Sequence, residues 1–303
     1  MSLRLEMLQV ARLAPKVLGD STELIREFLI RQQNPDGGFQ DRAGKSDLYY
    51  TVFGMDALLA IQSDRHLETT EEYVRSFHHG HELDFVHLCC LARGWAGVTD
   101  GRTRSPFVQE ILQRIESFRT ADGGYNPKPG AGSGTAYGNF LALGACLDLG
   151  EKPPEPLRLV QSFKLLETND GAWLNERVSN DLPITARQDV GSTNATAAAV
   201  TLLRNLDMPV NTGVGDWLVA RFHPQGGFLA TPQAPVPDLL STATALHALS
   251  GMQYDFEHLK EPCLDFVDSL WTNEGAFHGN WTDDALDCEY TFYGLLALGH
   301  LSL

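Results

Sequence analysis

The segment NPDGGF (residues 34–39) recurs along the sequence as ADGGY (121–125), NDGAW (169–173), PQGGF (224–228) and NEGAF (273–277). The first glycines of these segments stand at positions 37, 123, 171, 226 and 275, so the successive intervals are 86, 48, 55 and 49 residues. The first interval spans two periods, which places a shortened member near FHHGHELDF (77–85). Periods of this length are typical of proteins built from repeated supersecondary units.

Each repeat predicts two helices. Segments such as STELIREFLIRQQ (21–33) and SPFVQEILQRIESF (105–118) have apolar residues at intervals of three and four, with charges on the other face. This pattern predicts amphipathic outer helices. The glycine that follows them suits a left-handed helix stop.

The segments after the turns carry few charges, which predicts inner helices that are covered on most sides. In order, they are DLYYTVFGMDAL (47–58), HELDFVHLCCLA (81–92), AGSGTAYGNFLA (131–142), DVGSTNATAAAV (189–200), DLLSTATALHAL (238–249) and DCEYTFYGLLAL (287–298). Four of the six begin with Asp, and five have Thr four residues later.

These repeats predict an all-α fold, an α/α toroid of six helical hairpins with an inner and an outer ring. The C-terminal segment YGLLALGHLSL (293–303) is apolar and lacks the polar face of a capping repeat, so closure into a barrel is favoured over an open solenoid. We expect a single domain over residues 1–303, with an N-terminal helix in 1–20 and six repeats in 21–301.

Composition excludes several classes of partner. The chain has 39 acidic residues against 23 Lys and Arg, a net charge of −16, which repels nucleic acid and anionic membrane surfaces. No segment is long and apolar enough to span a membrane, and the N-terminus does not read as a signal peptide, so a cytoplasmic protein is expected. The five cysteines have no paired spacing and are expected to be buried free thiols.

A Gly-Gly-aromatic turn followed by an inner helix that opens Asp-x-x-x-Thr resembles the repeats of protein prenyltransferase β subunits. It is similar, more distantly, to squalene-hopene cyclases and class II terpenoid cyclases. The resemblance covers residues 21–301. It implies a central lumen that receives an isoprenoid and, for the transferases, a helical α-subunit-like protein partner.

The transferases hold zinc through Asp-x-Cys at the start of one inner helix and a His three residues after the Asp of the next. Asp238 matches the Asp, but Leu240 stands at the Cys position and Tyr290 at the His position. With the helices stacked as above, the Cys position reads Tyr49, Leu83, Ser133, Gly191, Leu240 and Glu289, and the His position reads Tyr50, Asp84, Gly134, Ser192, Ser241 and Tyr290. Zinc needs N and S donors, so we expect no zinc and no other cofactor, and standard zinc-dependent transferase activity is not supported.

The cyclases protonate an alkene with the middle Asp of Pro-Asp-x-Asp-Asp-Thr-Ala. The segment PDLLSTA (237–243) keeps the first Asp as Asp238 but has Leu240 and Ser241 at the other two acids. The sixth repeat, LDCEYT (286–291), restores a carboxyl as Glu289, which an apolar lumen would keep neutral and able to act as an acid.

Glu289, Asp287 and Asp238 are therefore candidate catalytic residues. The favoured alternative for Asp47, Asp189, Asp238 and Asp287 is that they cap the N-termini of the inner helices.

Further candidates follow from the same resemblance. The lumen-lining candidates are Tyr49, Tyr50, Phe53, Tyr137, Thr193, Thr242, Tyr290 and Tyr293, some of which would instead fill the core. Arg221 is the one candidate for binding a diphosphate. The histidines of HHGHELDFVH (78–87) are interpreted as a surface cluster because their spacing is irregular, and no metal site is predicted.

Three functions remain open. The first is a prenyltransferase-like or terpenoid-cyclase-like toroid that binds an isoprenoid or another elongated apolar ligand without zinc, alone or with a partner subunit. The second is a terpene-cyclase-like enzyme with Glu289 as its acid. The third is a carbohydrate-active α/α-barrel hydrolase, which needs two carboxyls flanking a sugar; the tryptophans, interpreted as lying in turns and outer helices, disfavour it.

Overall fold

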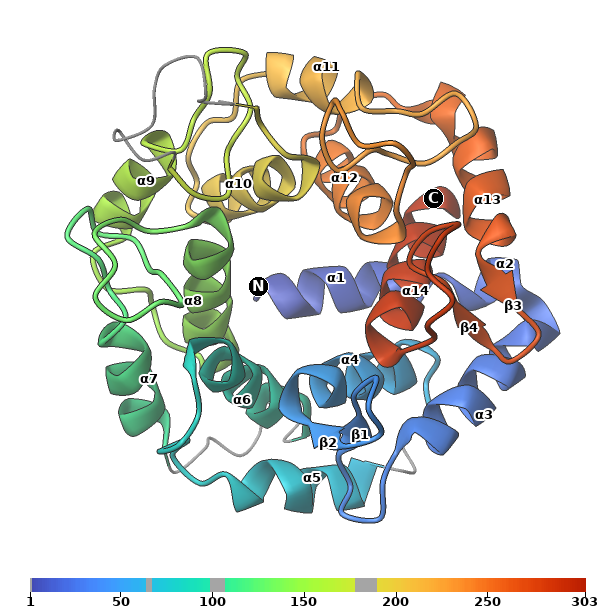
Figure 1. Ribbon diagram of the computed structural model, residues 1–303, viewed down its shortest axis with the longest axis horizontal. Helices are drawn as coiled ribbons and strands as arrows, with labels where there is room; N and C mark the ends of the chain where they lie inside the picture. The colour runs from blue at the N-terminus through green and yellow to red at the C-terminus, as the bar shows by residue number, and fades with distance from the viewer. Residues whose placement is uncertain (1, 64–66, 99–106, 178–189) are drawn as a thin grey trace.

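The computed structural model describes residues 2–63, 67–98, 107–177 and 190–303, which form a closed ring of helical hairpins (Figure 1). Within these residues the inner helices are α4 (Leu48–Ala60), α6 (Phe85–Val98), α8 (Ala136–Asp148), α10 (Thr193–Asn205), α12 (Leu239–Gly251) and α14 (Cys288–Leu301). The outer helices are α3 (Thr22–Gln32), α5 (Leu67–Ser76), α7 (Val108–Glu116), α9 (Pro156–Lys164), α11 (Gly213–Val219) and α13 (Lys260–Ser269). The predicted all-α toroid is confirmed.

The remaining elements are short. Strands β1 (Phe39–Gln40) and β2 (Ser46–Asp47) pair antiparallel around the loop before α4, and β3 (Trp271–Thr272) and β4 (Ala276–Phe277) pair across the last turn. The chain begins with α1 (Leu3–Ala11), α2 (Pro15–Leu18) and the 3₁₀ helix η1 (Gly19–Ser21), and η3 (Glu257–Leu259) precedes α13. The five cysteines are buried and unpaired, as expected. No helix in the described part of the chain combines the length and apolar character needed to cross a membrane.

The ring closes where the sixth hairpin meets the first, with α14 packed beside α4 (Figure 1). The hydroxyl of Tyr49 on α4 donates a hydrogen bond to Glu289 on α14 at 2.6 Å. Arg42, in the loop before α4, donates from Nε to Asp287 at 3.0 Å. Both bonds join residues at least 240 positions apart in the chain. The apolar C-terminal helix is therefore covered by the first repeat.

In four of the five repeated turns, the first glycine lies against the next outer helix. Gly275 has φ +88°, and a Cβ there would lie 2.0 Å from the carbonyl oxygen of Leu24 on α3. Gly37, with φ +89°, makes the same approach to the carbonyl of Thr69 on α5. Only glycine combines this backbone conformation with so close an approach. One recurring contact thus joins neighbouring repeats and also closes the ring.

A second set of hydrogen bonds links four of the turns to the inner helix that follows each of them. The backbone N–H groups of Phe39, Trp173 and Phe228 donate to the hydroxyls of Thr51, Thr196 and Thr242, and that of Tyr125 donates to the side-chain oxygen of Asn139. Phe39 and Phe228 are fully buried. The polar side chain four residues after each cap therefore satisfies a buried donor that would otherwise be unpaired.

The caps correct the predicted alignment of the repeats. Asp47, Thr135, Ser192, Asp238 and Asp287 each accept a hydrogen bond from the first turn of their inner helix. In the second repeat, Asp84 accepts the N–H of His87. The starts predicted at 81, 131 and 189 are thus three or four residues too early; at 131 and 189 the reason is that Thr135 and Ser192 cap the helix in place of Asp. Asp189 itself lies outside the described residues.

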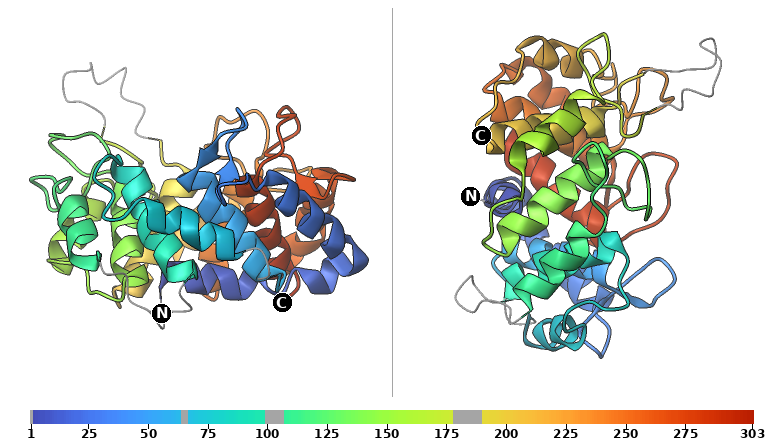
Figure 2. Two further views of the ribbon diagram at one scale, coloured as in Figure 1. Left: turned by 90° about the horizontal axis from the view of Figure 1, so that it is seen from below. Right: turned by 90° about the vertical axis from the view of Figure 1, so that its left-hand side faces the viewer.

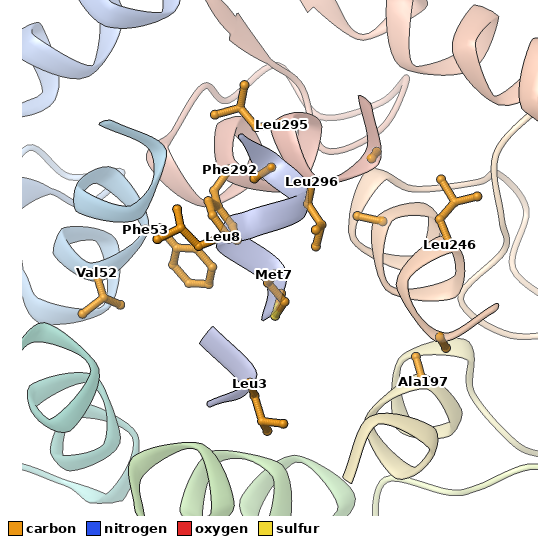
Figure 3. Close-up of a cluster of buried hydrophobic side chains, with 14 of the residues drawn as sticks. Leu3, Met7, Leu8, Val52, Phe53, Ala197, Leu246, Phe292, Leu295 and Leu296 are labelled. Carbon is orange, nitrogen blue, oxygen red and sulfur yellow. The ribbon is translucent and has the colours of Figure 1, made fainter. Parts of the chain in front are cut away.

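Helix α1 lies inside the ring, at the face where the inner helices end; the loops that precede the inner helices gather on the opposite face (Figures 1 and 2). Its residues Leu3, Met7 and Leu8 are buried and point among the inner helices (Figure 3). The carbonyl of Val10 packs against Gly299, where a Cβ would lie 2.1 Å from it. The N-terminal helix expected within residues 1–20 is therefore part of the core.

Ion pairs fasten α1 on two sides. Asp56 of α4 is completely buried and lies 2.7 Å from Arg4 of α1 and 2.6 Å from Arg93 of α6. On the other side, Glu6 lies 3.1 Å from Arg204 of α10. A carboxylate as deeply buried as Asp56 requires such partners, because an unpaired charge in the interior is strongly destabilising.

Candidate functional site

A cavity of about 410 Å³ occupies the lumen between α1 and the inner helices. It is called the lumen cavity below. Its lining residues are Met7, Tyr49, Tyr137, Phe140, Asn175, Ser192, Asn194, Ala195, Ala197, Ala198, Thr201, Leu240, Thr244, His247, Glu289 and Tyr293. Its volume falls within the range of small-molecule sites, which are mostly apolar with a few placed polar groups.

One position of the repeat faces this cavity. Tyr49, Tyr137, Asn194, Leu240 and Glu289 line it, and each lies two residues after the cap of its inner helix. Side chains recur on one helix face at intervals of three and four residues, so the next turns add residues such as Thr244, His247 and Tyr293. The lumen surface is therefore set by the cap register of each repeat.

Glu289 is the carboxyl among the residues that line this cavity. Burial raises its pKa to about 7, and the nearby charge of Asp287 acts in the same direction. The hydrogen bond from Tyr49 and the charges of Arg42 and Arg93 act against this rise and favour the ionised form. The carboxyl can thus carry a proton near neutral pH, and its conjugate base already has a hydrogen-bond donor in place.

Aromatic rings surround this carboxyl. The ring centroids of Tyr49 and Phe53 are 5.1 Å apart, and those of Phe53 and Tyr293 are 5.5 Å apart. The guanidinium of Arg93 lies over the Phe53 ring at 4.7 Å and over the Phe292 ring at 5.5 Å. Phe53 lines a second, smaller cavity of about 100 Å³ that adjoins the first. Rings of this kind offer their faces to a cation in a dry site.

Asp238 and Asp287, the other two catalytic candidates, are turned to the helix ends. Asp238 accepts hydrogen bonds from the N–H and the hydroxyl of Ser241, both at 2.7 Å, and burial raises its pKa. Asp287 accepts the N–H of Tyr290 at 2.9 Å and is paired with Arg42. Both carboxyls cap their helices, and neither lines the lumen cavity.

The other predicted lumen residues divide into two groups. Tyr49, Tyr137 and Tyr293 line the lumen cavity, and Phe53 lines the smaller one. Tyr50, Thr193, Thr242 and Tyr290 line neither. The two threonines are fully buried in hydrogen bonds to backbone carbonyls, those of Leu229 and Asp238. Thr193 lies one residue after its cap, Ser192, whereas Thr242 lies four residues after its cap, Asp238. The two positions differ because the fourth repeat starts three residues later than predicted.

Arg221 lies outside the lumen. Its guanidinium stacks over the ring of Trp217 at 4.6 Å, and burial lowers its pKa. It is not among the residues that line the lumen cavity. The structure therefore does not bring this diphosphate candidate together with Glu289.

The corrected register moves a histidine to the position that binds zinc in the transferases. His87 is three residues after Asp84, and its Nε2 lies 3.2 Å from Asp47 of the preceding inner helix. Its Nδ1 lies 2.8 Å from Asp84, and the hydrogen bond with Asp47, followed by that with Asp84, raises the pKa of His87 to about 9. Tyr49 stands at the Cys position, so no thiolate is present.

This donor set does not fit zinc, because both ring nitrogens of His87 already face carboxylates and Tyr49 donates to Glu289. In the part of the chain that the structure describes, no group of three His, Cys, Asp or Glu side chains is arranged to hold a metal ion. The expectation that the protein needs no cofactor stays a prediction.

Sequence reasoning missed the polar residues on the far wall of the cavity. Thr244 on α12 donates to Asn194 on α10 at 2.8 Å, and Asn175 accepts the N–H of Tyr137 at 3.0 Å. His247 lines the cavity deeper down and shares a hydrogen bond of 3.0 Å with His300. Burial lowers the pKa of His247 to about 4, so it is neutral at pH 7. The sequence signal for Asn194 is its position two residues after the cap Ser192. The prediction placed the start of this helix at Asp189, three residues too early, and so missed it.

A closed double ring of helices around an aromatic-lined cavity defines an α/α toroid protein. The family model of the prenyltransferase alpha-alpha toroid domain matches residues 6–87 and 194–302. The matched residues make up more than half of the chain, which therefore belongs to this family. No curated protein sequence matches the chain.

Solved structures show the same fold at low sequence identity. The type II terpene cyclase MstE from Scytonema matches with a TM-score of 0.63 and 15% identity, over 94% of this chain and 97% of the other. Protein geranylgeranyltransferase-I from Candida albicans, complexed with GGPP, matches with a TM-score of 0.51 and 15% identity over 98% and 82%. A polysaccharide lyase matches with a TM-score of 0.63 and 11% identity over 95% and 97%. These similarities concern the fold alone.

Proposed function

We propose that the lumen cavity binds an isoprenoid or another elongated apolar molecule, and that it does so without zinc. The observation that carries this proposal is the lumen cavity of about 410 Å³, whose walls are mainly Tyr, Phe, Leu, Met and Ala side chains. Burying an apolar chain there releases water from its whole length, which is the dominant favourable term in binding such ligands. Met7 of α1 lines the cavity, and α1 lies at the opposite face of the ring from the loops (Figure 2).

Related toroids support the choice of ligand class. The Scytonema cyclase has been solved in complex with geranylgeranyl dihydroxybenzoate, its substrate. We propose a ligand of the same broad class here, an isoprenoid chain that lies along the lumen. A cytoplasmic location and a helical partner protein resembling the transferase α subunit are part of the same proposal.

The proposal is tested by extracting the protein with organic solvent after expression in isoprenoid-rich cells and identifying retained lipids by mass spectrometry. We expect at least one isoprenoid in stoichiometric amount. Ala198→Phe, which fills the cavity from α10, should abolish retention, whereas Ala121→Phe in an exposed turn should not. An empty wild-type protein that also fails to bind added geranylgeraniol would reject the proposal.

A second candidate function is supported by Glu289 in particular: acid catalysis of the terpene-cyclase type. In this mechanism Glu289 transfers its proton to one carbon of a terminal C=C bond, and the electron pair of that bond forms the new C–H bond. The carboxylate left behind keeps the Tyr49 hydrogen bond, and the tertiary cation faces the tyrosine rings. This acid requires the protonated form of Glu289, so the rate should fall as the pH rises through about 7.

This second candidate is tested by incubating the protein with squalene or with geranylgeranyl substrates and analysing the products. Glu289→Gln keeps the shape of the side chain but has no proton to give, and should lower the rate about 10²-fold or more. Leu240→Met, at the matching position of α12, is the control for a change of cavity wall. A wild type that converts none of the substrates leaves binding as the function.

The geometry offers less support for a carbohydrate-active hydrolase. Glycoside hydrolysis uses two carboxyls that flank the sugar, whereas Glu289 carries the one carboxyl among the described residues that line the lumen cavity. Trp95 lies in the inner helix α6 and not in a turn or outer helix, contrary to the sequence interpretation. Its ring packs under Arg75 of α5, away from the lumen, so no indole face is presented to a sugar by this residue.

A further inference from the structure

We infer that the lumen cavity selects an isoprenoid whose head group is uncharged and forms hydrogen bonds, such as an alcohol, a phenol or a quinone, and that it rejects prenyl diphosphates. The inference rests on the proposed ligand-binding function and adds the chemistry of the head group. It follows from three side chains on one wall of the cavity, Asn175, Asn194 and Thr244, which we call the polar arc.

The polar arc has hydrogen-bonding capacity left over. Asn175 accepts the N–H of Tyr137 through Oδ1, which fixes its amide so that both N–H donors of Nδ2 are available on the other side. Asn194 and Thr244 bond to each other across α10 and α12 at 2.8 Å, which leaves one end of the Asn194 amide available. Asn194 and Thr244 are partly buried, and spare hydrogen-bonding capacity is costly there unless a ligand or water uses it, whereas Asn175 is exposed.

Asn194 of the arc lies across the ring from Tyr49, whereas Thr244 stands on α12, which packs beside the α14 helix of Glu289. Asn194 stands on α10, which is opposite α4 in the order of the inner helices, and both Asn194 and Tyr49 are two residues after their caps (Figure 1). A ligand that fills the cavity therefore contacts neutral donors and acceptors on one wall and a carboxyl on the other. Neither wall supplies a positive charge.

No Lys or Arg lines the lumen cavity in the described part of the chain. The arginines near its walls already have carboxylate partners: Arg42 pairs with Asp283 and Asp287, Arg93 with Asp56, and Arg204 with Glu6.

Three of the inner-helix N-termini carry a carboxylate, whereas α8 and α10 are capped by the neutral Thr135 and Ser192. Asp47, Asp238 and Asp287 occupy the starts of α4, α12 and α14. A diphosphate usually meets cations or free helix N-termini, and here it would be desolvated against carboxylates in a chain with a net charge of −16. A neutral head loses little on entering and gains the hydrogen bonds of the arc.

The test is a calorimetric titration with geranylgeraniol, geranylgeranyl diphosphate and the headless hydrocarbon farnesene. The proteins are the wild type, the double variant Asn194→Leu/Thr244→Val, and the control Ser250→Ala, which lies on α12 outside the lumen cavity. Circular dichroism confirms folding of each. We expect the alcohol to bind at least about tenfold more tightly than the diphosphate. The double variant should lose about five- to thirtyfold in affinity for the alcohol, the worth of one or two hydrogen bonds, with farnesene unchanged.

Each result decides the matter. A diphosphate that binds as tightly as the alcohol overturns the inference. If the double variant changes the affinity for neither farnesene nor the alcohol, the polar arc does not bind the head group, but the binding of an apolar ligand still stands. If no ligand binds any of the three proteins, the proposed function fails and the inference fails with it.

Discussion

Asp287 and Glu289 stand two residues apart at the start of α14, yet their surroundings assign them different chemistry. Asp287 accepts the N–H of Tyr290 and is paired with Arg42, so it is held as a helix cap. Glu289 faces the lumen cavity, where burial raises its pKa to about 7 and Tyr49 is its hydrogen-bond donor. The difference arises because side chains two residues apart on a helix point in different directions.

The raised pKa of Glu289 makes the stability of the protein depend on pH. The folded chain binds this proton more tightly than the unfolded chain, whose carboxyl titrates near 4.5. Between about pH 4.5 and 7 the native state therefore holds more protons, and the free energy of unfolding falls as the pH rises, by up to about 3 kcal/mol from this group. Urea denaturation of the wild type and Glu289→Gln at pH 5 and pH 8 measures the effect.

Glutamine resembles the neutral acid at every pH. The free energy of unfolding of Glu289→Gln should therefore not fall through the titration of this group, and the variant should gain stability relative to the wild type at pH 8. Tyr49→Phe is the matched control, because removing the donor to the ionised form should raise the pKa of Glu289 further. Equal pH dependence of wild type and Glu289→Gln would show that Glu289 is ionised throughout this range.

Substitutions at two turn glycines distinguish the cost of backbone strain from the cost of a steric clash. Gly275 and Gly171 both have positive φ, but a Cβ at Gly275 would lie 2.0 Å from the Leu24 carbonyl, whereas none of the described atoms lies within 4 Å of a Cβ at Gly171. We expect Gly171→Ala to destabilise the protein by about 1 kcal/mol, from strain alone. Gly275→Ala should cost about 2 to 4 kcal/mol, because the contact that closes the ring must also shift. Chemical denaturation compares the two, and equal losses would contradict the contact.

At the scale of the elements, the polar residue four positions after the cap links each turn to its inner helix. Thr242→Val keeps the shape of the side chain but leaves the buried N–H of Phe228 without its acceptor, and we expect a loss of about 1 to 3 kcal/mol in the free energy of unfolding. Thr201→Val on α10 removes only a bond to the carbonyl of Ala197 four residues back and should cost about 0.5 kcal/mol or less. Similar losses in both variants would show that the link to the turn does not matter.

The sequence could predict which segments form outer and inner helices, because the turn and the amphipathic period recur in each repeat. It could not fix the start of every inner helix. Thr135 and Ser192 do the work that Asp does elsewhere, and Asn139 replaces the usual Thr, so an alignment on Asp and Thr slips by three or four residues. That slip conceals Asn194 and places Thr193 in the lumen, where the structure has it buried against Leu229.

At the scale of the molecule, α1 decides how deep the lumen is. Met7 lines both the lumen cavity and the smaller cavity of about 100 Å³ that adjoins it. Met7→Ala should join the two spaces and shift the preference toward longer isoprenoids, at a stability cost of about 2 kcal/mol. Competition between geranylfarnesol and geranylgeraniol measures the shift. Leu5→Ala, an exposed position on the same helix, is the control, and an unchanged ratio for Met7→Ala would show that α1 does not limit chain length.

The position of α1 was beyond sequence reasoning. A short helix with mixed charge at the N-terminus gives no local signal of where it docks, and its partners Asp56 and Arg204 lie more than 50 residues away in the chain. The ring itself was predictable because six repeats with one apolar face each can bury that face only against their neighbours.

The seam between α4 and α14 has a consequence for biosynthesis. Tyr49 belongs to the first hairpin and Glu289 to the sixth, so a growing polypeptide cannot assemble this acid and its donor until residue 289 has left the ribosome. Up to that moment five hairpins form an arc with two uncovered apolar edges. Products of premature termination should therefore be inactive and prone to aggregate. Their exposed apolar edges would also mark them for removal by quality-control proteases.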